Sequence, residues 1–388
     1  MTDTHLPADA SAESFAVQGG GGHDSATGAV LPAVHLSTTY LRDKDNAYSS
    51  GYSYRRDDNP NVRQAEAVLQ RLENARGPAL LYSSGMSAAI SLFLALPSPA
   101  RVIAPEVMYW GLRQWLRLDG PRHGIATTFV DYADPEKVDA ALTETKPHLV
   151  WIETPGNPMW NITDIRSISE KAHAAGALVG CDSTVATPVL TRPLDLGADV
   201  VMHSASKYLN GHSDVIAGAL VFAEEGDLAG ETARNRRAMG PILSPLEAML
   251  LLRGMRTLHL RVRHHCEQAL KIAHHFDGHA RVAEVLYPGL PGRPGHNVAA
   301  NQMTGGFGGM MSIRVKGGAA AATATAANVK VWTRATSLGG VESLIEHRAS
   351  IEGPGTPVPD DLLRLSVGIE RADDLIADLE QALEARAA

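Results

Sequence analysis

The sequence predicts an α/β protein built around a mainly parallel sheet, with a smaller α/β domain at its C-terminal end. Two observations predict this fold class. Short apolar runs alternate with stretches of helical periodicity along most of the chain, and several of those runs are apolar at every position. Strands that are apolar on both faces belong in a sheet covered by helices on both sides. Strand–helix alternation of this kind favours parallel pairing.

The elements of the large domain can be placed one by one. Seven predicted strands lie at residues 79–82, 101–104, 126–130, 148–153, 177–182, 199–204 and 218–223. A helix is expected to begin at Pro60, because Asn59 offers a capping side chain and proline suits the first helical position. Gly77-Pro78 ends that run. Further helices are expected at 86–96 and 163–176.

The pattern changes near Pro241, where a long helical stretch begins. Its interruption at Gly254 predicts either a kink or a boundary between two helices. The elements expected beyond it are strands at 308–317 and 362–370, a plain helix at 318–327 and a closing helix at 372–385. We therefore predict an N-terminal arm over residues 1–58, a large domain over 59–240 and a C-terminal domain over 241–388.

Composition limits the functional classes. A chain of 388 residues is too long for one core, and its 44% apolar and 20% charged residues are typical of a soluble globular protein. A net charge of −8 argues against binding to nucleic acid or to an anionic membrane. The two cysteines, Cys181 and Cys266, cannot form a disulfide framework. Without a signal peptide or an apolar stretch of membrane-spanning length, a cytoplasmic protein is expected.

Residues 1 to about 28 are small, polar and Gly-rich, with Gly19 to Gly22 in a row. No strand precedes these glycines, so a flexible arm is predicted rather than a phosphate-binding loop. The histidine pairs at 264–265 and 274–275 have no carboxylate at ligand spacing, and no metal site is expected.

Three strand ends carry residues with chemical potential, and such ends hold functional groups in this kind of sheet. Asp182 closes one apolar run, where it is equally well a helix cap or a turn residue. Lys207 follows the next strand and is flanked by Ser204 and Ser206. The small residues at 83–88 form a turn directly before a helix, which is an anion site by geometry and dipole.

Together these segments resemble the cystathionine γ-synthase/γ-lyase family, the Cys/Met-metabolism enzymes that use pyridoxal 5′-phosphate (PLP). The resemblance runs from about residue 25 to the end of the chain. The matching motifs, in the family's order, are TGAVLPAVHLSTTY, SYRRDDNPN, SSGMSA, ETPGNP, CDST, HSASKYLNGH, SLGGVESL and LLRLSVGIE. The resemblance implies PLP-dependent transferase fold type I, the aspartate-aminotransferase-like fold, with the cofactor bound by the large domain.

The resemblance also implies cofactor contacts. Lys207 matches the Schiff-base lysine, which later carries protons, and Asp182 matches the carboxylate that pairs with the pyridinium nitrogen. Tyr109 matches the aromatic residue stacked on the cofactor ring, which is also an acid–base candidate. The phosphate cradle matches the backbone amides of Gly85 and Met86 and the hydroxyls of Ser204 and Ser206.

Asn157 matches the residue near the cofactor 3′-oxygen, where it also borders the substrate. Arg364 and Ser337 match the clamp for the substrate α-carboxylate, which a planar guanidinium can bind through two hydrogen bonds. Tyr54 and Arg56 match residues that reach the phosphate of the neighbouring subunit. The resemblance therefore implies an obligatory dimer, expected to pair into a homotetramer.

This chain departs from the family pattern near the distal part of the substrate. Asp57 stands where cystathionine-handling members can carry an arginine, and Asp58 stands where glycine is usual. Thr336 replaces a glutamate common before SLGG, and the run Tyr109–Leu112 lacks the cysteine of methionine γ-lyases. An acid in place of a base should favour a cationic substrate tail. The alternative interpretation is that Asp57 and Asp58 are solvated loop residues.

The predicted activity is γ-elimination or γ-replacement on a γ-substituted L-amino acid, with canavanine as a candidate substrate. Cystathionine γ-lyase or cystathionine γ-synthase activity is the alternative within the family. An aminotransferase on the same fold is a rival, against which the SLGG and Y-x-R segments argue. A PLP-binding protein without catalysis would not need Tyr109 and Arg364, which are both present.

Overall fold

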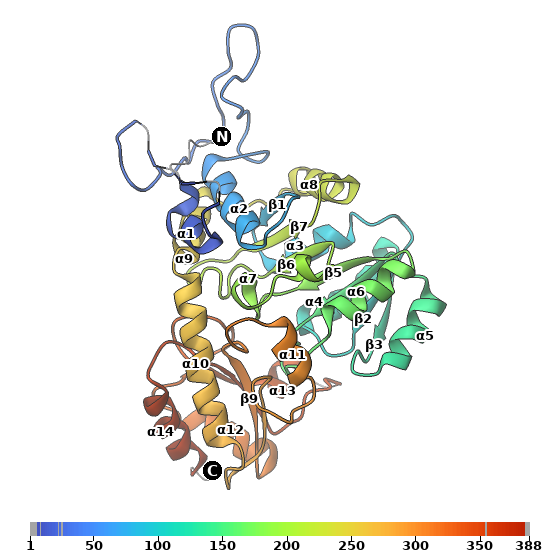
Figure 1. Cartoon of the computed structure of the whole chain (residues 1–388), viewed down its shortest axis with the longest axis vertical. Coiled ribbons are helices and arrows are strands. Elements are labelled where there is room, and N and C mark those ends of the chain that lie inside the picture. The colour runs from blue at the N-terminus through green and yellow to red at the C-terminus, as the bar shows by residue number, and fades with distance from the viewer. Residues whose placement is uncertain (1–5, 8, 22, 25, 354, 385–388) are drawn as a thin grey trace. The chain divides into compact units, whose positions relative to one another are not determined.

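The computed structural model describes residues 6–7, 9–21, 23–24, 26–353 and 355–384 (Figure 1). The chain forms two compact units. Unit 1 comprises Met1–Pro97 and Asp199–His259, and unit 2 comprises Ser98–Ala198 and Leu260–Ala388. The domain boundaries predicted at residues 58/59 and 240/241 stay a prediction.

Unit 1 contains three strands and the helices around them. Its strands are β1 (Ala79–Tyr82), β6 (Val200–His203) and β7 (Gly218–Phe222). Its helices are α1 (Ala12–Val17), a 3-10 turn η1 (Gly19–Gly21), α2 (Pro60–Leu72), α3 (Gly85–Phe93), α8 (Asp227–Met239) and α9 (Pro245–Met255). β7 pairs antiparallel with both β1 and β6. The Asn59 cap and the helix start at Pro60 are confirmed, since the Asn59 side chain accepts a hydrogen bond from the Asn61 N–H.

The prediction of a flexible N-terminal arm is wrong for part of its length, because α1 forms there. Ala16 is buried, the guanidinium of Arg256 donates to the Val17 carbonyl at 2.8 Å, and that of Arg71 donates to the Ala10 carbonyl at 2.8 Å. The buried Ala16 and the half-buried Phe15 let α1 pack against α2, whereas Val17 is exposed. Gly22, from the predicted glycine run, lies outside the described residues.

The first part of unit 2 is a parallel sheet with the strand order β5-β4-β2-β3. The strands are β2 (Ala100–Pro105), β3 (Ile125–Val130), β4 (Leu149–Glu153) and β5 (Leu178–Asp182). The helical segments between and after them are α4 (Trp110–Leu118), η2 (Gly120–His123), α5 (Pro135–Thr145), α6 (Ile165–Ala174), α7 (Thr187–Leu190) and η3 (Pro193–Leu196). Apolar side chains of α5 and α6 form one core with those of β4 and β5. The predicted α/β pattern with parallel pairing is confirmed.

The second part of unit 2 is a five-stranded sheet with the order β10-β11-β12-β9-β8. Its strands are β8 (Val282–Leu286), β9 (Met310–Val315), β10 (Thr333–Arg334), β11 (Leu344–His347) and β12 (Leu362–Ser366). The accompanying helices are α10 (Leu258–Phe276), which begins in unit 1, α11 (His296–Gln302), α12 (Gly318–Asn328), α13 (Arg348–Glu352) and α14 (Ala372–Leu383). α10, α12 and α14 bury apolar side chains in a shared core with this sheet. The strands and helices predicted for this region are confirmed.

The interruption at Gly254 is a boundary between two helices, since α9 ends at Met255 and α10 begins at Leu258. A Cβ atom on Gly254 would lie 2.2 Å from the Asn210 carbonyl oxygen. The last turn of α9 therefore lies against the backbone of the segment after Lys207, and only glycine leaves room for that approach.

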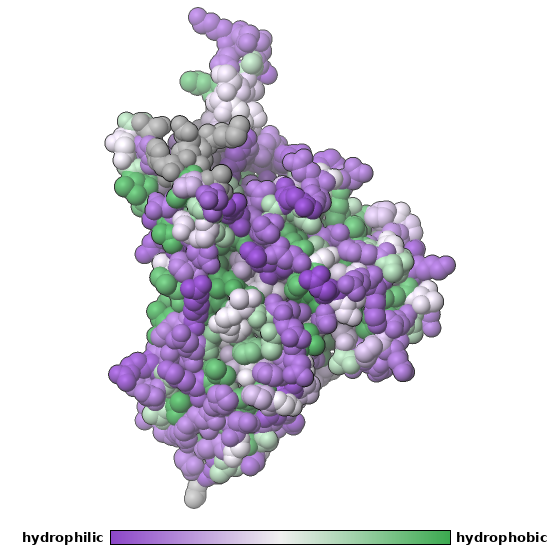
Figure 2. Space-filling model, in the orientation of Figure 1, coloured by the Kyte–Doolittle hydropathy of each residue, from purple (hydrophilic) through white to green (hydrophobic). Residues whose placement is uncertain are grey.

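Hydrophilic side chains predominate on the face of the molecule shown in Figure 2. Among the helices of the described residues, none is both long and apolar enough to cross a membrane.

Stability should depend on pH through His265, a fully buried residue of α10. Its ring Nδ1 donates to the Val367 carbonyl at 2.7 Å and lies 3.1 Å from the Gly368 carbonyl. Burial lowers the pKa of His265 from 6.5 to about 4. The unfolded chain therefore binds this proton first as the pH falls, so stability should be highest above pH 6.5 and decline between pH 6.5 and 4. The expected loss is about 3 kcal/mol of unfolding free energy.

This loss can be measured by urea unfolding of the wild type and of His265→Gln at several pH values. The glutamine amide can still donate to the same carbonyls but does not titrate. The variant should lose less stability on acidification, and parallel pH profiles would contradict the role of His265.

Candidate active site

The loop that carries Lys207 lies in unit 1, between β6 and β7. Lys207 is half-buried; its N–H donates to the Ser204 carbonyl at 3.0 Å, and its own carbonyl accepts from the Gly211 N–H at 2.7 Å. Ser206 is tied to the residue directly before β7, because its hydroxyl donates to the Ala217 carbonyl at 3.1 Å and accepts from the Ala217 N–H at 2.9 Å. These bonds hold the lysine in a compact turn at the end of β6.

The N-terminus of α3 lies against this loop. Ser84 caps the helix through reciprocal bonds with Ser87 of 3.0 and 3.1 Å. The N–H groups of Gly85 and Met86 belong to the first helical turn, where no intrahelical acceptor exists and anions bind. A Cβ atom on Gly85 would lie 2.9 Å from the Ser204 Cβ. Unit 1 thus brings together four of the predicted phosphate contacts, and the first-turn amides of α3 suit a phosphate group.

A second glycine keeps this turn close to β7. A Cβ atom on Gly218 would lie only 2.1 Å from the Ser84 carbonyl oxygen. Behind the loop, the ring of His203 lies 2.5 Å from the carboxylate of Glu73, and both side chains are fully buried. Our sequence reasoning missed Gly218, His203 and Glu73. His203 could have been found, because a histidine at the end of an apolar strand is unusual.

The segment with Tyr54, Arg56 and Asp57 also belongs to unit 1. The Arg56 guanidinium carbon lies 5.0 Å from the centroid of the Tyr54 ring, and that ring is exposed. Asp58 forms an ion pair with Arg63 and accepts from the Asn59 N–H at 2.7 Å. Among the described residues, the half-buried carboxylate of Asp57 has no hydrogen-bond or ion-pair partner. The two acids are therefore not equivalent.

In unit 2, one buried carboxylate joins two of the predicted cofactor residues. Glu153 ends β4; its Oε2 accepts from the Tyr109 N–H at 2.7 Å and its Oε1 from the Asn157 N–H at 2.9 Å. Asp182 ends the neighbouring strand β5, directly opposite Glu153 in the parallel register. Burial and the charge of Asp182 raise the pKa of Glu153 to about 8, and the two N–H donors oppose this rise. Glu153 is the first residue of the ETPGNP motif, for which the sequence predicts no role of this carboxylate.

The predicted α-carboxylate clamp lies in the same unit and is joined to Asn157. Arg364, on β12, donates to the Asn157 side-chain oxygen at 3.2 Å and to the Ser337 carbonyl at 2.9 Å. It also pairs with Glu346 at 2.7 Å. Burial lowers the pKa of Arg364 to about 10, which leaves it charged at neutral pH. Ser337 has a φ of 91°, a conformation that non-glycine residues adopt rarely and mostly at functional sites.

Glu346 extends this cluster into a buried network of charges. Its carboxylate accepts from Arg348 at 3.0 Å, and Arg348 pairs with Glu352 at 2.9 Å. Two cations and two anions balance, which buried ions require. Sequence patterns carry no signal for Glu346, because its partners Arg348 and Arg364 lie on different elements.

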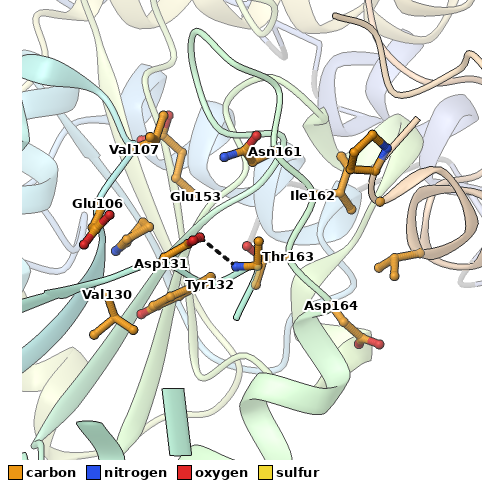
Figure 3. A pocket seen from close by; sticks show the side chains of 15 residues that line it. Glu106, Val107, Val130, Asp131, Tyr132, Glu153, Asn161, Ile162, Thr163 and Asp164 are labelled. Atoms are coloured by element: carbon orange, nitrogen blue, oxygen red, sulfur yellow. Dashed lines mark hydrogen bonds between the residues drawn. The ribbon is translucent and has the colours of Figure 1, made fainter. Parts of the chain in front are cut away.

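Glu153 also lines a separate pocket of unit 2 with a volume of about 480 Å³ (Figure 3). Most of the labelled side chains around it come from the carboxyl ends of β2, β3 and β4 and from the segment before α6, and they include Glu106, Asp131 and Asp164. No residue predicted from the sequence as a site residue lines this pocket. Water in it can reach the region of Glu153.

The fold and these two clusters define a PLP-dependent enzyme of fold type I. Residues 13–384 match the family model described as "Cys/Met metabolism PLP-dependent enzyme". The chain belongs to this family and uses pyridoxal 5′-phosphate. The family predicted from the sequence is confirmed, as are the fold class and the cofactor.

Individual relatives narrow the class. The chain is 43% identical over 374 residues to a cystathionine γ-synthase of Mycobacterium tuberculosis, covering 95% of each chain. It is 37% identical over 376 residues to a cystathionine γ-lyase of Dictyostelium discoideum, covering 95% of this chain and 96% of the other. A crystal structure of cystathionine γ-synthase from Xanthomonas oryzae pv. oryzae, in complex with aminoacrylate and cysteine, superposes with a TM-score of 0.92 at 40% identity, covering 97% and 98% of the two chains. The protein is therefore an enzyme of the cystathionine γ-synthase/γ-lyase type that acts on an amino acid.

The close approach at Gly218 can be tested through stability. Gly218→Ala places a methyl group against the Ser84 carbonyl and must displace the start of α3 or β7. We expect a loss of about 3 kcal/mol in unfolding free energy, at the upper end for overpacking. Gly230→Ala, in α8 of the same unit, is the matched control, because no atom lies within 4 Å of its added Cβ. The control should be neutral or slightly stabilising. Equal thermal denaturation curves for the two variants would contradict the constraint.

Proposed function

We propose that the enzyme acts on a γ-substituted L-amino acid whose distal end is cationic, such as canavanine. The observation that carries this proposal is the difference between the two neighbouring acids. Asp58 is neutralised by Arg63, whereas the half-buried Asp57 has no partner among the described residues. A carboxylate without a protein cation is available to a guanidinium or ammonium group of a ligand.

The roles proposed for the site residues follow the family motifs. Lys207 binds the cofactor covalently, and Asp182 pairs with its ring nitrogen. Tyr109 stacks on the ring, Asn157 lies near the 3′-oxygen and the substrate, and Arg364 with Ser337 holds the substrate α-carboxylate. The phosphate is assigned to the amides of Gly85 and Met86, to Ser204 and Ser206, and to Tyr54 and Arg56 of a neighbouring subunit.

When bound, pyridoxal phosphate supplies an electron-withdrawing ring that stabilises negative charge at the substrate α-carbon. The Lys207 amine, released by the substrate amine, is proposed to accept the α-proton, and loss of a β-proton then allows the bond between Cγ and its substituent to break. With canavanine the broken bond is Cγ–O, and the guanidino-oxy group leaves as hydroxyguanidine. The remaining four-carbon unit gives 2-oxobutanoate and ammonia after hydrolysis, or a replaced amino acid if a nucleophile adds at Cγ.

The assembly is proposed to be a dimer or a pair of dimers. The exposed apolar side chains in the segment before Tyr54 support it, since Val30, Leu36 and Leu41 are 77%, 63% and 94% exposed. Apolar residues clustered in this way indicate a surface that another protein chain covers. A neighbouring subunit would both cover them and receive Tyr54 and Arg56.

A second candidate function is cystathionine γ-synthase activity, with an anionic substrate tail. The 43% identity to the mycobacterial cystathionine γ-synthase favours it. Asp57, which has no partner among the described residues, disfavours it, because a carboxylate repels an anionic tail.

Covalent attachment of the cofactor tests the central role. Lys207→Ala should bind PLP only non-covalently, because no amine remains at that position to form the bond. The measurements are the visible absorption of the lysine-linked cofactor and mass spectrometry after borohydride reduction. A reduced adduct on another lysine, with an undiminished visible band, would show that Lys207 is not the attachment site.

The substrate preference tests the proposed function. Wild-type enzyme should process canavanine with a higher kcat/KM than cystathionine or O-succinylhomoserine, with products identified by mass spectrometry. Asp57→Asn should lower kcat/KM for canavanine about ten-fold, the low end for loss of a charge-assisted contact at a partly exposed site. Asp58→Asn is the matched control, because its carboxylate serves Arg63, and it should leave the preference unchanged. A wild-type preference for cystathionine, or equal effects of the two variants, would contradict the cationic-tail proposal.

A further inference from the structure

Glu153 holds two separate segments of unit 2 through their main chains. Tyr109 lies 44 residues before it and Asn157 four residues after it, and each donates its backbone N–H to a different oxygen of the one carboxylate, at 2.7 and 2.9 Å. The Glu153 side chain is only 6% exposed and lies at the end of a fully buried strand. The sheet therefore fixes the position of the Glu153 carboxylate, and this carboxylate fixes the backbone positions of Tyr109 and Asn157.

Besides the N–H bond to Glu153, the Tyr109 carbonyl accepts from the Arg113 N–H at 3.1 Å, and no hydrogen bond among the described residues orients the Tyr109 side chain. Its ring is 44% exposed, and as the N-cap residue of α4 it makes no side-chain capping bond. A Cβ atom on Gly111 would lie 3.0 Å from the Cε1, Cζ and Oη atoms of this ring. The ring thus lies over the bare backbone of Gly111, and the N–H bond to Glu153 fixes the backbone from which it projects.

The effect of Glu153 on Asn157 extends further. The Asn157 side-chain oxygen accepts from Arg364 at 3.2 Å, and Arg364 donates to the Ser337 carbonyl. A shift of the Asn157 backbone would move one acceptor of this guanidinium. One carboxylate is therefore linked, directly or through Asn157, to four of the residues to which the proposed function assigns cofactor or substrate contacts.

A carboxylate at this position is unfavourable for electrostatic reasons. The group is buried and faces Asp182 across the β4–β5 pair, and both effects disfavour its charge. A neutral side chain at this position would make the folded state more stable. A carboxyl group can nevertheless accept both N–H bonds, one on each oxygen, and in its protonated form the O–H can turn away from the two donors. A glutamine amide has only one acceptor oxygen and would turn an N–H donor towards one of the two backbone N–H groups.

We propose that Glu153 is a positioning residue, which sets the placement of the Tyr109 ring and of the Asn157 side chain through their backbone N–H groups. This inference rests on the roles given to Tyr109 and Asn157 under the proposed function. Glu153 itself need not touch cofactor or substrate.

The test compares Glu153→Gln with Glu106→Gln in the cofactor-loaded enzyme. Glu106 lines the same pocket in Figure 3, is exposed, and accepts no hydrogen bond from another described residue, so it is the matched control. In Glu153→Gln, amide hydrogen exchange should accelerate at least ten-fold at Tyr109 or Asn157. The circular dichroism of the bound cofactor should change, since the ring that faces it has moved. The cofactor content per chain should stay the same, because Lys207 is untouched.

Kinetics separate positioning from a purely structural role. Displacing both Tyr109 and Asn157 should lower kcat and raise KM together, with kcat/KM reduced ten- to hundred-fold, while Glu106→Gln keeps wild-type values. Should Glu153→Gln fail to fold, Glu153→Asp replaces it; that variant keeps both acceptors but withdraws them by one methylene, and an intermediate change in exchange and circular dichroism is expected.

Protection at both amides and an unchanged cofactor signal in Glu153→Gln, with the loss confined to thermal stability, would overturn the inference. Its failure is distinguishable from that of the proposed function. Exchange and circular dichroism require no substrate, so they can support the role of Glu153 even if canavanine is not processed.

Discussion

The hydrogen bonds accepted by the Glu153 carboxylate are the constraint on which most of the unit 2 cluster depends. They join Tyr109, at the start of α4, and Asn157, in the loop after β4, to the end of β4. The Asn157 side chain in turn accepts a hydrogen bond from Arg364, and Arg364 also donates to the Ser337 carbonyl. Burial and the neighbouring Asp182 raise the pKa of Glu153 to about 8, and the two N–H donors offset only part of this rise.

The cluster in unit 1 depends on a different constraint, the absence of side-chain atoms. At Gly85 and Gly218 the backbones of α3, β7 and the Lys207 loop approach so closely that a single methyl group would collide with a neighbour. This close approach leaves the first amides of α3 next to Ser204, and a helix N-terminus of this kind suits a phosphate. The buried His203–Glu73 pair holds the end of β6 from the other side.

Charge balance distinguishes parts of the site that look alike in sequence. Arg364 is surrounded by Glu346, Arg348 and Glu352, so its charge is compensated before any carboxylate arrives. A ligand that binds there must share the guanidinium with Glu346. Asp57 is the opposite case, a carboxylate that the described part of the chain leaves without a cation. The family fixes the chemistry at the cofactor, and such local differences in charge are what can change the substrate.

The sequence by itself determined most of the strands, helices such as α2, α6 and α14, the family, and residues at or after strand ends such as Asp182 and Lys207. These follow from periodicity, capping and motifs, which act over a few residues. The sequence did not predict the strands β8, β10 and β11 or helices such as α4, α5 and α8. The tertiary structure decided which residues become partners. It gave Glu153 a donor 44 residues away, paired Arg364 with Glu346, and buried Ala16 of the helix at Ala12–Val17. It also neutralised Asp58 while leaving Asp57 without a partner among the described residues. These pairings depend on which side chains come into contact after folding. Local sequence patterns span only a few residues and do not show which distant residues will be in contact.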